Sequence, residues 1–147
     1  MNSDFRRILS EGARVERLGK GFQFTEGPVW NVRGGYLLFS DIPANRIIKW
    51  SPRDGFSDFR VPSGKSNGLT LDKRGRLIVC EHANRRVSRV EEGGVVTIAS
   101  HYEGKRLNSP NDVVVKSDGS VYFTDPPYGL NPVFGTLEEM ELNFGSS

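Results

Sequence analysis

Three copies of one short pattern recur along the chain, and this repeat constrains the fold more than any other feature. The copies read EGPVWNVRGGYLLFSD from Glu26, NGLTLDKRGRLIVCE from Asn67 and NDVVVKSDGSVYFTD from Asn111. They begin 41 and 44 residues apart, and the second and third align without a gap. Each copy has two runs of β-branched, aliphatic or aromatic residues joined by a glycine-containing turn, which predicts a β-hairpin.

Two further strands are expected after each of the first two hairpins. NRIIKWSP and GFSDFRV follow the first copy, and NRRVSRVEE and GGVVTIAS follow the second. Four short strands every ~40–45 residues are typical of a β-propeller blade. We therefore predict an all-β, partial propeller domain over 1–147, with an N-terminal extension at 1–21, blades at 22–62 and 63–106, and the start of a further blade at 107–147.

The number of blades predicts that the ring is incomplete. A propeller closes with at least about four blades, and two blades with the start of a third are visible here. We therefore expect the chain to be the N-terminal half of a longer protein. An open half-propeller would also expose sheet faces, which favours self-association.

Oxygen-bearing side chains recur at the start of the first strand in each copy. In a propeller the first strand of each blade runs along the central channel, so residues at one repeat position form a ring at one end. Glu26, Asn67 and Asn111 occupy such positions. A carboxylate with amides suits Ca²⁺ or Mg²⁺, and Zn²⁺ remains an alternative. Simple capping of turns is the other interpretation of the same residues.

Composition argues against several other classes of function. The 147 residues carry a net charge of only +2, with scattered lysines and arginines, which argues against a nucleic-acid partner. The single cysteine, Cys80, cannot form an internal disulfide. The N-terminal segment has no long apolar run, so we expect neither a signal peptide nor a membrane span, and a cytoplasmic location. GKSNG around Ser66 matches a nucleophile-elbow pattern but is followed by strand, turn and strand, which argues against a serine hydrolase.

Five motifs in order resemble a known family over residues 22–130. FTEGPVW, LLFSDI, SNGLTLDKRGRLIVCEH, RRVSRV and LNSPNDVVVKSDGSVYFTDPPYG are similar to the gluconolactonase branch of the regucalcin, gluconolactonase and luciferin-regenerating-enzyme family. The resemblance implies a six-bladed propeller with one divalent cation, often Ca²⁺, at one end of the channel. It also implies hydrolysis of sugar lactones such as gluconolactone, and hence a role in carbohydrate metabolism.

The resemblance assigns some site residues and leaves others outside the chain. Glu26 matches the family's glutamate ligand, and Asn111 matches the asparagine near the metal and substrate. Two more ligands, an asparagine and an aspartate, belong to the family's later blades. That aspartate is also the family's proposed general base, so the catalytic residue is expected beyond residue 147.

Further substrate contacts are predicted from the repeat and its flanking loops. Asn67 shares a repeat position with Asn111 and is expected to line the same opening. His82 in CEHANRR and Arg106 in GKRLNSP are candidate substrate contacts. Tyr128 in DPPYG is expected to pack against its turn rather than bind a sugar.

Acidic residues recur at the end of the second strand in each copy. Asp41, Glu81 and Asp125 share this position. We expect them near the opposite end of the channel, either gathered in a ring or as solvated loop carboxylates.

Two other functions stay open at this point. A propeller with the same metal could hydrolyse an aryl ester or an organophosphate. A propeller could also bind a protein partner without catalysis, although the Trp-Asp dipeptide common in such scaffolds is absent from the sequence.

Overall fold

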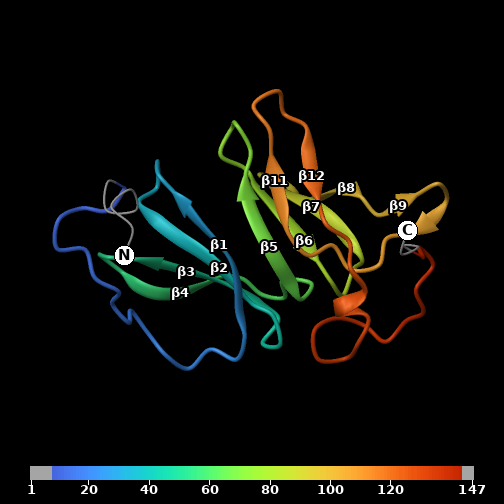
Figure 1. Cartoon of the computed structure of the whole chain (residues 1–147), viewed down its shortest axis with the longest axis horizontal. Helices are drawn as coiled ribbons and strands as arrows, with labels where there is room; N and C mark the ends of the chain where they lie inside the picture. The colour runs from blue at the N-terminus through green and yellow to red at the C-terminus, as the bar shows by residue number, and fades with distance from the viewer. Residues whose placement is uncertain (1–7, 144–147) are drawn as a thin grey trace.

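Antiparallel strands make up almost all of the regular structure (Figure 1) in the computed structural model, which describes residues 8–143. The first sheet contains β1 (Thr25–Asn31), β2 (Tyr36–Asp41), β3 (Arg46–Ser51) and β4 (Gly55–Arg60). The second contains β5 (Ser66–Leu71), β6 (Leu77–Glu81), β7 (Arg86–Glu91) and β8 (Gly94–Ala99). In both sheets every strand pairs with the next one along the chain.

The remaining elements are short. β9 (His101–Tyr102) pairs with β10 (Lys105–Arg106), and β11 (Val113–Val115) pairs with β12 (Val121–Phe123). One 3₁₀ turn covers Pro127–Gly129. Residues 8–21 of the predicted N-terminal extension form turns and irregular backbone, and residues 1–7 lie outside the described part of the chain. No helix within 8–143 is long and apolar enough to cross a membrane.

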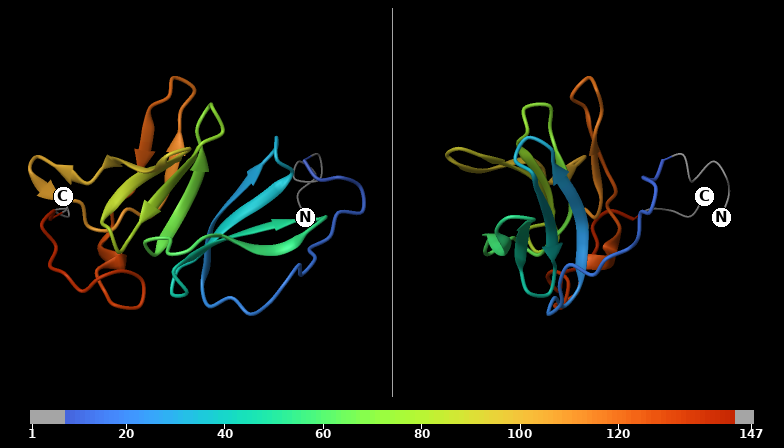
Figure 2. Two further views of the ribbon diagram at one scale, coloured as in Figure 1. Left: turned by 180° about the vertical axis from the view of Figure 1, so that it is seen from behind. Right: turned by 90° about the vertical axis from the view of Figure 1, so that its left-hand side faces the viewer.

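The first strands of the three hairpins lie next to one another. β5 contacts β1 on one side and β11 on the other, and it lies between them in Figures 1 and 2. Consecutive blades of a propeller are arranged in this way, with four-stranded sheets side by side around inner strands. The chain therefore forms part of a β-propeller, with two complete blades and the first hairpin of a third, as the repeat predicts.

The central strand β6 is buried on both of its faces. Leu77 and Val79 pack with residues of the first blade, in a cluster that includes Leu38. Cys80, on the other face, packs against the third hairpin in a cluster that includes Val113. A strand covered on both sides has no solvent-facing positions, which explains why RLIVC is continuously apolar instead of alternating.

Two glycines allow the inner strands to approach closely. A Cβ on Gly27 would lie 2.9 Å from the Cα of Gly68 and closer still to the carbonyl oxygen of Asn67. A Cβ on Gly68 would lie 2.7 Å from the Cα of Asp112. The Gly68 N–H donates to the Asn111 carbonyl at 2.7 Å, which ties the second blade to the third. Gly27 follows Glu26 and Gly68 follows Asn67, and the close packing of the inner strands requires glycine at both positions.

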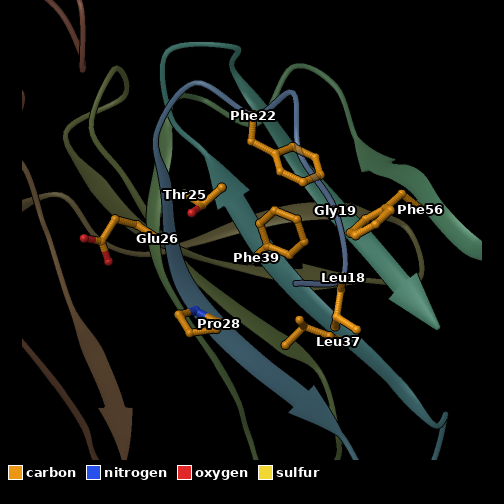
Figure 3. A pocket seen from close by; sticks show the side chains of 9 residues that line it. All are labelled: Leu18, Gly19, Phe22, Thr25, Glu26, Pro28, Leu37, Phe39 and Phe56. Carbon is orange, nitrogen blue, oxygen red and sulfur yellow. The ribbon is translucent and has the colours of Figure 1, made fainter. Parts of the chain in front are cut away.

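The face of the first blade that points away from the second is aromatic. Phe22 packs edge-on against Phe39 with ring centroids 5.1 Å apart, and Phe56 lies 5.3 Å from Phe22. These rings, with Leu18 of the N-terminal segment, border a cavity of about 300 Å³ (Figure 3). The self-association expected from open sheet faces stays a prediction.

Candidate functional site

One pocket contains four of the five residues predicted for the site. Its volume is about 270 Å³. The lining residues are Phe24, Glu26, Ile42, Asn67, His82, Asn111, Tyr128 and Phe134. They come from all three blades and from the segment after the third hairpin. The repeat accounts for this convergence, because the starts of β1, β5 and β11 meet at one end of the inner strands.

The acidic residues that end the second strands lie at this same end. Thr25 pairs with Asp41 across β1 and β2, and Ser66 pairs with Glu81 across β5 and β6. Because an antiparallel hairpin folds back on itself, the end of its second strand lies beside the start of its first. The expectation that these acids lie near the opposite end is therefore wrong.

Glu26 points into the space between the blades. Its side chain is exposed, and one carboxylate oxygen accepts a hydrogen bond from the Gly27 N–H at 3.3 Å. Figure 3 shows the carboxylate turned away from the phenylalanine rings of the first blade. The residue is thus placed to offer negative charge to a ligand at the channel end.

Asn111 is held by its backbone. Its N–H donates to the Thr124 carbonyl at 2.9 Å, and its carbonyl accepts from Gly68 at 2.7 Å. These two bonds fix the backbone between its own hairpin partner and the neighbouring blade. The half-buried side chain then lines the pocket from a rigid support.

Asn67 and His82 form a buried pair beside Glu26. Asn67 is 7% exposed and His82 is 1% exposed. Asn67 Nδ2 lies 3.4 Å from His82 Nε2, and His82 Nδ1 lies 3.1 Å from the Phe134 carbonyl oxygen. Burial lowers the pKa of His82 below its usual 6.5, with a smaller opposing effect from the Phe134 hydrogen bond.

The segment after the third hairpin supplies two lining residues that the sequence did not assign to the site. Tyr128 lines the pocket with 68% of its surface exposed, and the expectation that it packs against its turn rather than binds a sugar stays a prediction. Phe134 lines the pocket and packs edge-on against Phe24 at 5.2 Å. The repeat gave no signal for Phe134, since this segment has no counterpart in the first two copies.

Arg106 lies outside this pocket, on the small β9–β10 hairpin. Its guanidinium donates to the Asn84 carbonyl at 3.2 Å and lies 3.7 Å from the Glu138 carboxylate. Its backbone N–H donates to Glu141 at 2.9 Å. In the described part of the chain these contacts connect the second blade to the C-terminal segment, and the proposed substrate contact of Arg106 receives no support from the geometry.

Asp41 and Glu81 are buried anchors rather than solvated loop carboxylates. Both are 0% exposed. One Asp41 oxygen accepts from the N–H groups of Gln23 and Phe24, and the other pairs with Arg46 at 3.2 Å. The carboxylate thereby fixes the chain as it enters β1. In the third copy Asp125 accepts from the Asn108 N–H at 2.7 Å in the same manner.

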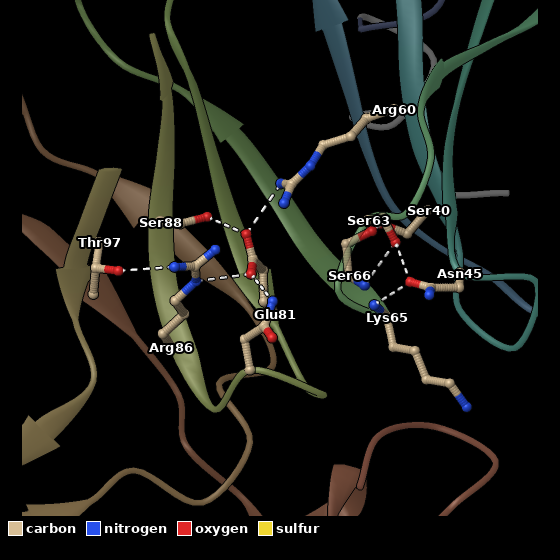
Figure 4. A network of polar contacts seen from close by, with 11 residues as sticks. Ser40, Asn45, Arg60, Ser63, Lys65, Ser66, Glu81, Arg86, Ser88 and Thr97 are labelled. Atoms are coloured by element: carbon tan, nitrogen blue, oxygen red, sulfur yellow. Dashed lines mark hydrogen bonds and ion pairs between the residues drawn. The ribbon is translucent and has the colours of Figure 1, made fainter. Parts of the chain in front are cut away.

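Glu81 connects the first two blades through a larger network (Figure 4). Its oxygens accept hydrogen bonds from Arg60 of β4 at 3.0 Å and Arg86 of β7 at 2.8 Å, and from Ser88 and Asn84. Burial by itself raises the pKa of Glu81. The hydrogen bonds from Arg86, Ser88 and Asn84 and the charge of Arg60 outweigh it and hold the pKa below its usual value of 4.5.

The Glu81 network predicts a loss of stability in acid. A carboxyl whose folded pKa lies below the unfolded value of 4.5 stabilises the fold fully above that pH. This stabilisation is lost as the pH falls through the lower, folded pKa. Glu81→Gln should therefore lower the free energy of unfolding by about 1–3 kcal/mol at pH 7. The difference from wild type should shrink below pH 4.5 in urea titrations, and a difference independent of pH would contradict this account.

The pocket has oxygen donors suited to a hard cation. Glu26 offers a carboxylate and Asn111 offers an amide oxygen. Carboxylate and amide oxygens are preferred by Ca²⁺ and Mg²⁺, and Ca²⁺ takes 6–8 oxygen ligands. Within residues 8–143 no three His, Cys, Asp or Glu side chains come together to hold a metal. The described residues therefore fit part of such a coordination shell, with one charged ligand.

Comparisons with known proteins agree with the motifs. The family model described as SMP-30/Gluconolactonase/LRE-like region matches residues 24–145. A gluconolactonase of Zymomonas mobilis is 39% identical over 92% of this chain and 43% of its own length. A regucalcin of Oryctolagus cuniculus is 27% identical over 66% of this chain and 32% of its own length.

Solved structures share the fold. A gluconolactonase from Xanthomonas campestris superimposes with a TM-score of 0.82 at 35% identity, covering 85% of this chain and 43% of that one. The chain spans less than half of the length of each relative named here.

Proposed function

The chain belongs to the SMP-30/gluconolactonase/LRE-like family, and we propose that it forms the N-terminal part of a divalent-metal-dependent lactonase that opens a sugar lactone. One observation carries this proposal. Glu26 and Asn111, assigned from the motifs, line a single pocket at the channel end together with Asn67 and His82. Gluconolactonase activity in relatives from Zymomonas mobilis and Xanthomonas campestris supports the same class of substrate.

The side chains of the pocket have different roles: some provide charge or hydrogen bonds, and others provide apolar surface. Glu26 supplies the negative charge that attracts a cation, and the amides of Asn67 and Asn111 offer donors and acceptors to lactone oxygens and hydroxyls. Tyr128 and Phe134 also line the pocket, and we expect their aromatic rings to limit the access of bulk water to the reacting carbonyl. When bound, a divalent cation such as Ca²⁺ supplies polarisation of the lactone carbonyl and a lower pKa for an attached water.

A second carboxylate is needed to complete this chemistry. Hydrolysis requires a base that takes the proton of the attacking water. Among the described residues that line the pocket, Glu26 is the single carboxylate, and the motifs assign it to the cation rather than to the role of base. We propose that the base and the remaining ligands come from further blades, since the chain spans about half of the length of its relatives.

Chelation tests the proposed function. Gluconolactone hydrolysis is measured on a protein extended by its downstream coding sequence, first with a chelator and then after adding back Ca²⁺, Mg²⁺ or Zn²⁺. We expect activity to disappear with the chelator and to return with the metal, whereas the 147-residue chain stays inactive. Full activity in the chelator would overturn metal dependence, and activity of the 147-residue chain would overturn the proposed division of the site. An extended protein that hydrolyses no lactone would overturn the lactonase assignment itself.

A further inference from the structure

We propose that His82 is a positioning residue that turns the carboxamide oxygen of Asn67 toward the pocket, where it accepts a hydrogen bond from a substrate hydroxyl. The loop from Gly129 to Thr136 holds the His82 imidazole in the neutral form that carries its proton on Nδ1, and this form orients Asn67. The inference deepens the proposed lactonase function and rests on it for the identity of the ligand. The orientation of Asn67 stands on the geometry alone.

The hydrogen bonds of His82 determine which ring nitrogen carries the proton. Its Nδ1 lies 3.1 Å from the Phe134 carbonyl oxygen, which can only accept. Nδ1 must therefore carry the hydrogen. In a neutral imidazole the other nitrogen, Nε2, is then an acceptor. The ring is 1% exposed, and a charged imidazole would lose its hydration there, so burial favours the neutral form.

The state of His82 determines the orientation of Asn67. Nε2 accepts a hydrogen bond from Asn67 Nδ2 at 3.4 Å. Were the carboxamide flipped, its oxygen would face a lone pair of the imidazole, with no hydrogen between the two acceptors. The nitrogen of Asn67 therefore faces His82, and the oxygen is left on the pocket side, among Glu26 and Asn111.

The first two blades differ at this position in a way that supports the assignment. Ile42 follows Asp41 as His82 follows Glu81, and both Ile42 and His82 line the pocket. In the first blade the residue at the repeat position of Asn67 is Glu26. Its two carboxylate oxygens are equivalent, so no neighbour is needed to orient it. The carboxamide of Asn67 has one oxygen and one nitrogen, so its two orientations differ, and its neighbour is a histidine.

The loop from Gly129 to Thr136 packs directly on the imidazole. A Cβ on Gly129 would lie 2.7 Å from His82 Nδ1 and 2.6 Å from its Cγ, so only glycine permits this contact. The Thr136 N–H donates to the Gly129 carbonyl at 3.1 Å and closes the loop. Lys65 Nζ donates to the carbonyls of Pro132 and Val133 at 2.6 and 2.7 Å. These contacts hold the Phe134 carbonyl against the ring.

A double-mutant cycle on the extended protein tests the coupling. We expect His82→Leu, which keeps the bulk and removes both hydrogen bonds, to raise KM for gluconolactone about tenfold with a smaller change in kcat, as for one lost hydrogen bond. In an Asn67→Ala background the same substitution should have almost no further effect. His82→Gln offers an amide oxygen near the position of Nε2 and should recover most of the wild-type KM. Equal effects of His82→Leu in both backgrounds would overturn the proposal.

A measurement without substrate separates this proposal from the proposed function. The imidazole ¹⁵N shifts of His82 in the wild-type protein report which nitrogen carries the proton. We expect the shifts of a neutral imidazole protonated on Nδ1. In Gly129→Ala the loop must move off the imidazole, so we expect the ¹⁵N shifts of His82 to differ from those of the wild type. A ring protonated on Nε2 would overturn the orientation of Asn67 even if lactone hydrolysis is observed. If no lactone is hydrolysed, this measurement still decides the orientation.

Discussion

Glu26→Gln is expected to lower lactone hydrolysis by the extended protein by more than about 100-fold. Removing an outer partner of a metal ligand typically costs about 10–100-fold, and Glu26 would contact the cation itself. Glutamine keeps the size of the side chain and removes its charge. Because Glu26 is exposed and accepts one local hydrogen bond, the melting temperature should change little without metal. Steady-state kinetics with saturating Ca²⁺ and thermal unfolding with chelator measure the two effects.

Glu92→Gln is the matched control for this substitution. Glu92 is an exposed acid in the turn between β7 and β8, and it does not line the pocket. The same change of net charge at this position should leave hydrolysis and Ca²⁺ affinity unchanged. Comparable losses in both variants would indicate a general effect of charge, and wild-type activity in Glu26→Gln would remove Glu26 from the site.

Gly27→Ala is expected to produce the largest loss of stability of any single substitution considered for this chain. The new Cβ would collide with the backbone of β5, and φ at Gly27 is +58°, where residues with a side chain are strained. Overpacking costs about 1–3 kcal/mol, and strain adds about 1 kcal/mol or more. Gly68→Ala has only the steric cost, against the backbone of Asp112. Urea unfolding should show both losses, with Gly27→Ala the larger.

Substitutions at two other glycines separate the cost of backbone strain from the cost of steric overlap. Gly75 has φ +80° with no atom within 4 Å of a Cβ, so Gly75→Ala measures backbone strain alone. Gly93 has open space and no positive φ, so Gly93→Ala should be close to neutral. If Gly68→Ala were as mild as Gly93→Ala, the inner strands could not be packed as closely as described.

The repeat was sufficient to predict the blades and the position of the ring residues. Strands with period-two or continuous apolar patterns and glycine turns are local signals, and three copies of them fix the register. Glu26, Asn67 and Asn111 could therefore be grouped before any coordinates. The wrong placement of Asp41 and Glu81 came from treating the end of a second strand as a separate end of the channel, although a hairpin returns to its start.

Other features depend on contacts that have no local signal. Phe134 reaches the pocket because a loop of irregular sequence folds back onto His82, more than 50 residues earlier in the chain. Burial of Glu81 depends on Arg60 from the preceding blade, 21 residues away. Long-range pairing of this kind is decided by the assembled fold rather than by the pattern of either segment.

The central claim is that Glu26 and Asn111 bind a cation at the channel end, and an anomalous-scattering experiment tests it most directly. Crystals of the extended protein are soaked in Mn²⁺ as a stand-in for Ca²⁺, and an anomalous difference map locates the metal. The account predicts one strong peak in the pocket, at bonding distance from the Glu26 carboxylate and within reach of Asn111. A fully occupied peak elsewhere, or no peak in the pocket at saturating Mn²⁺, would contradict it.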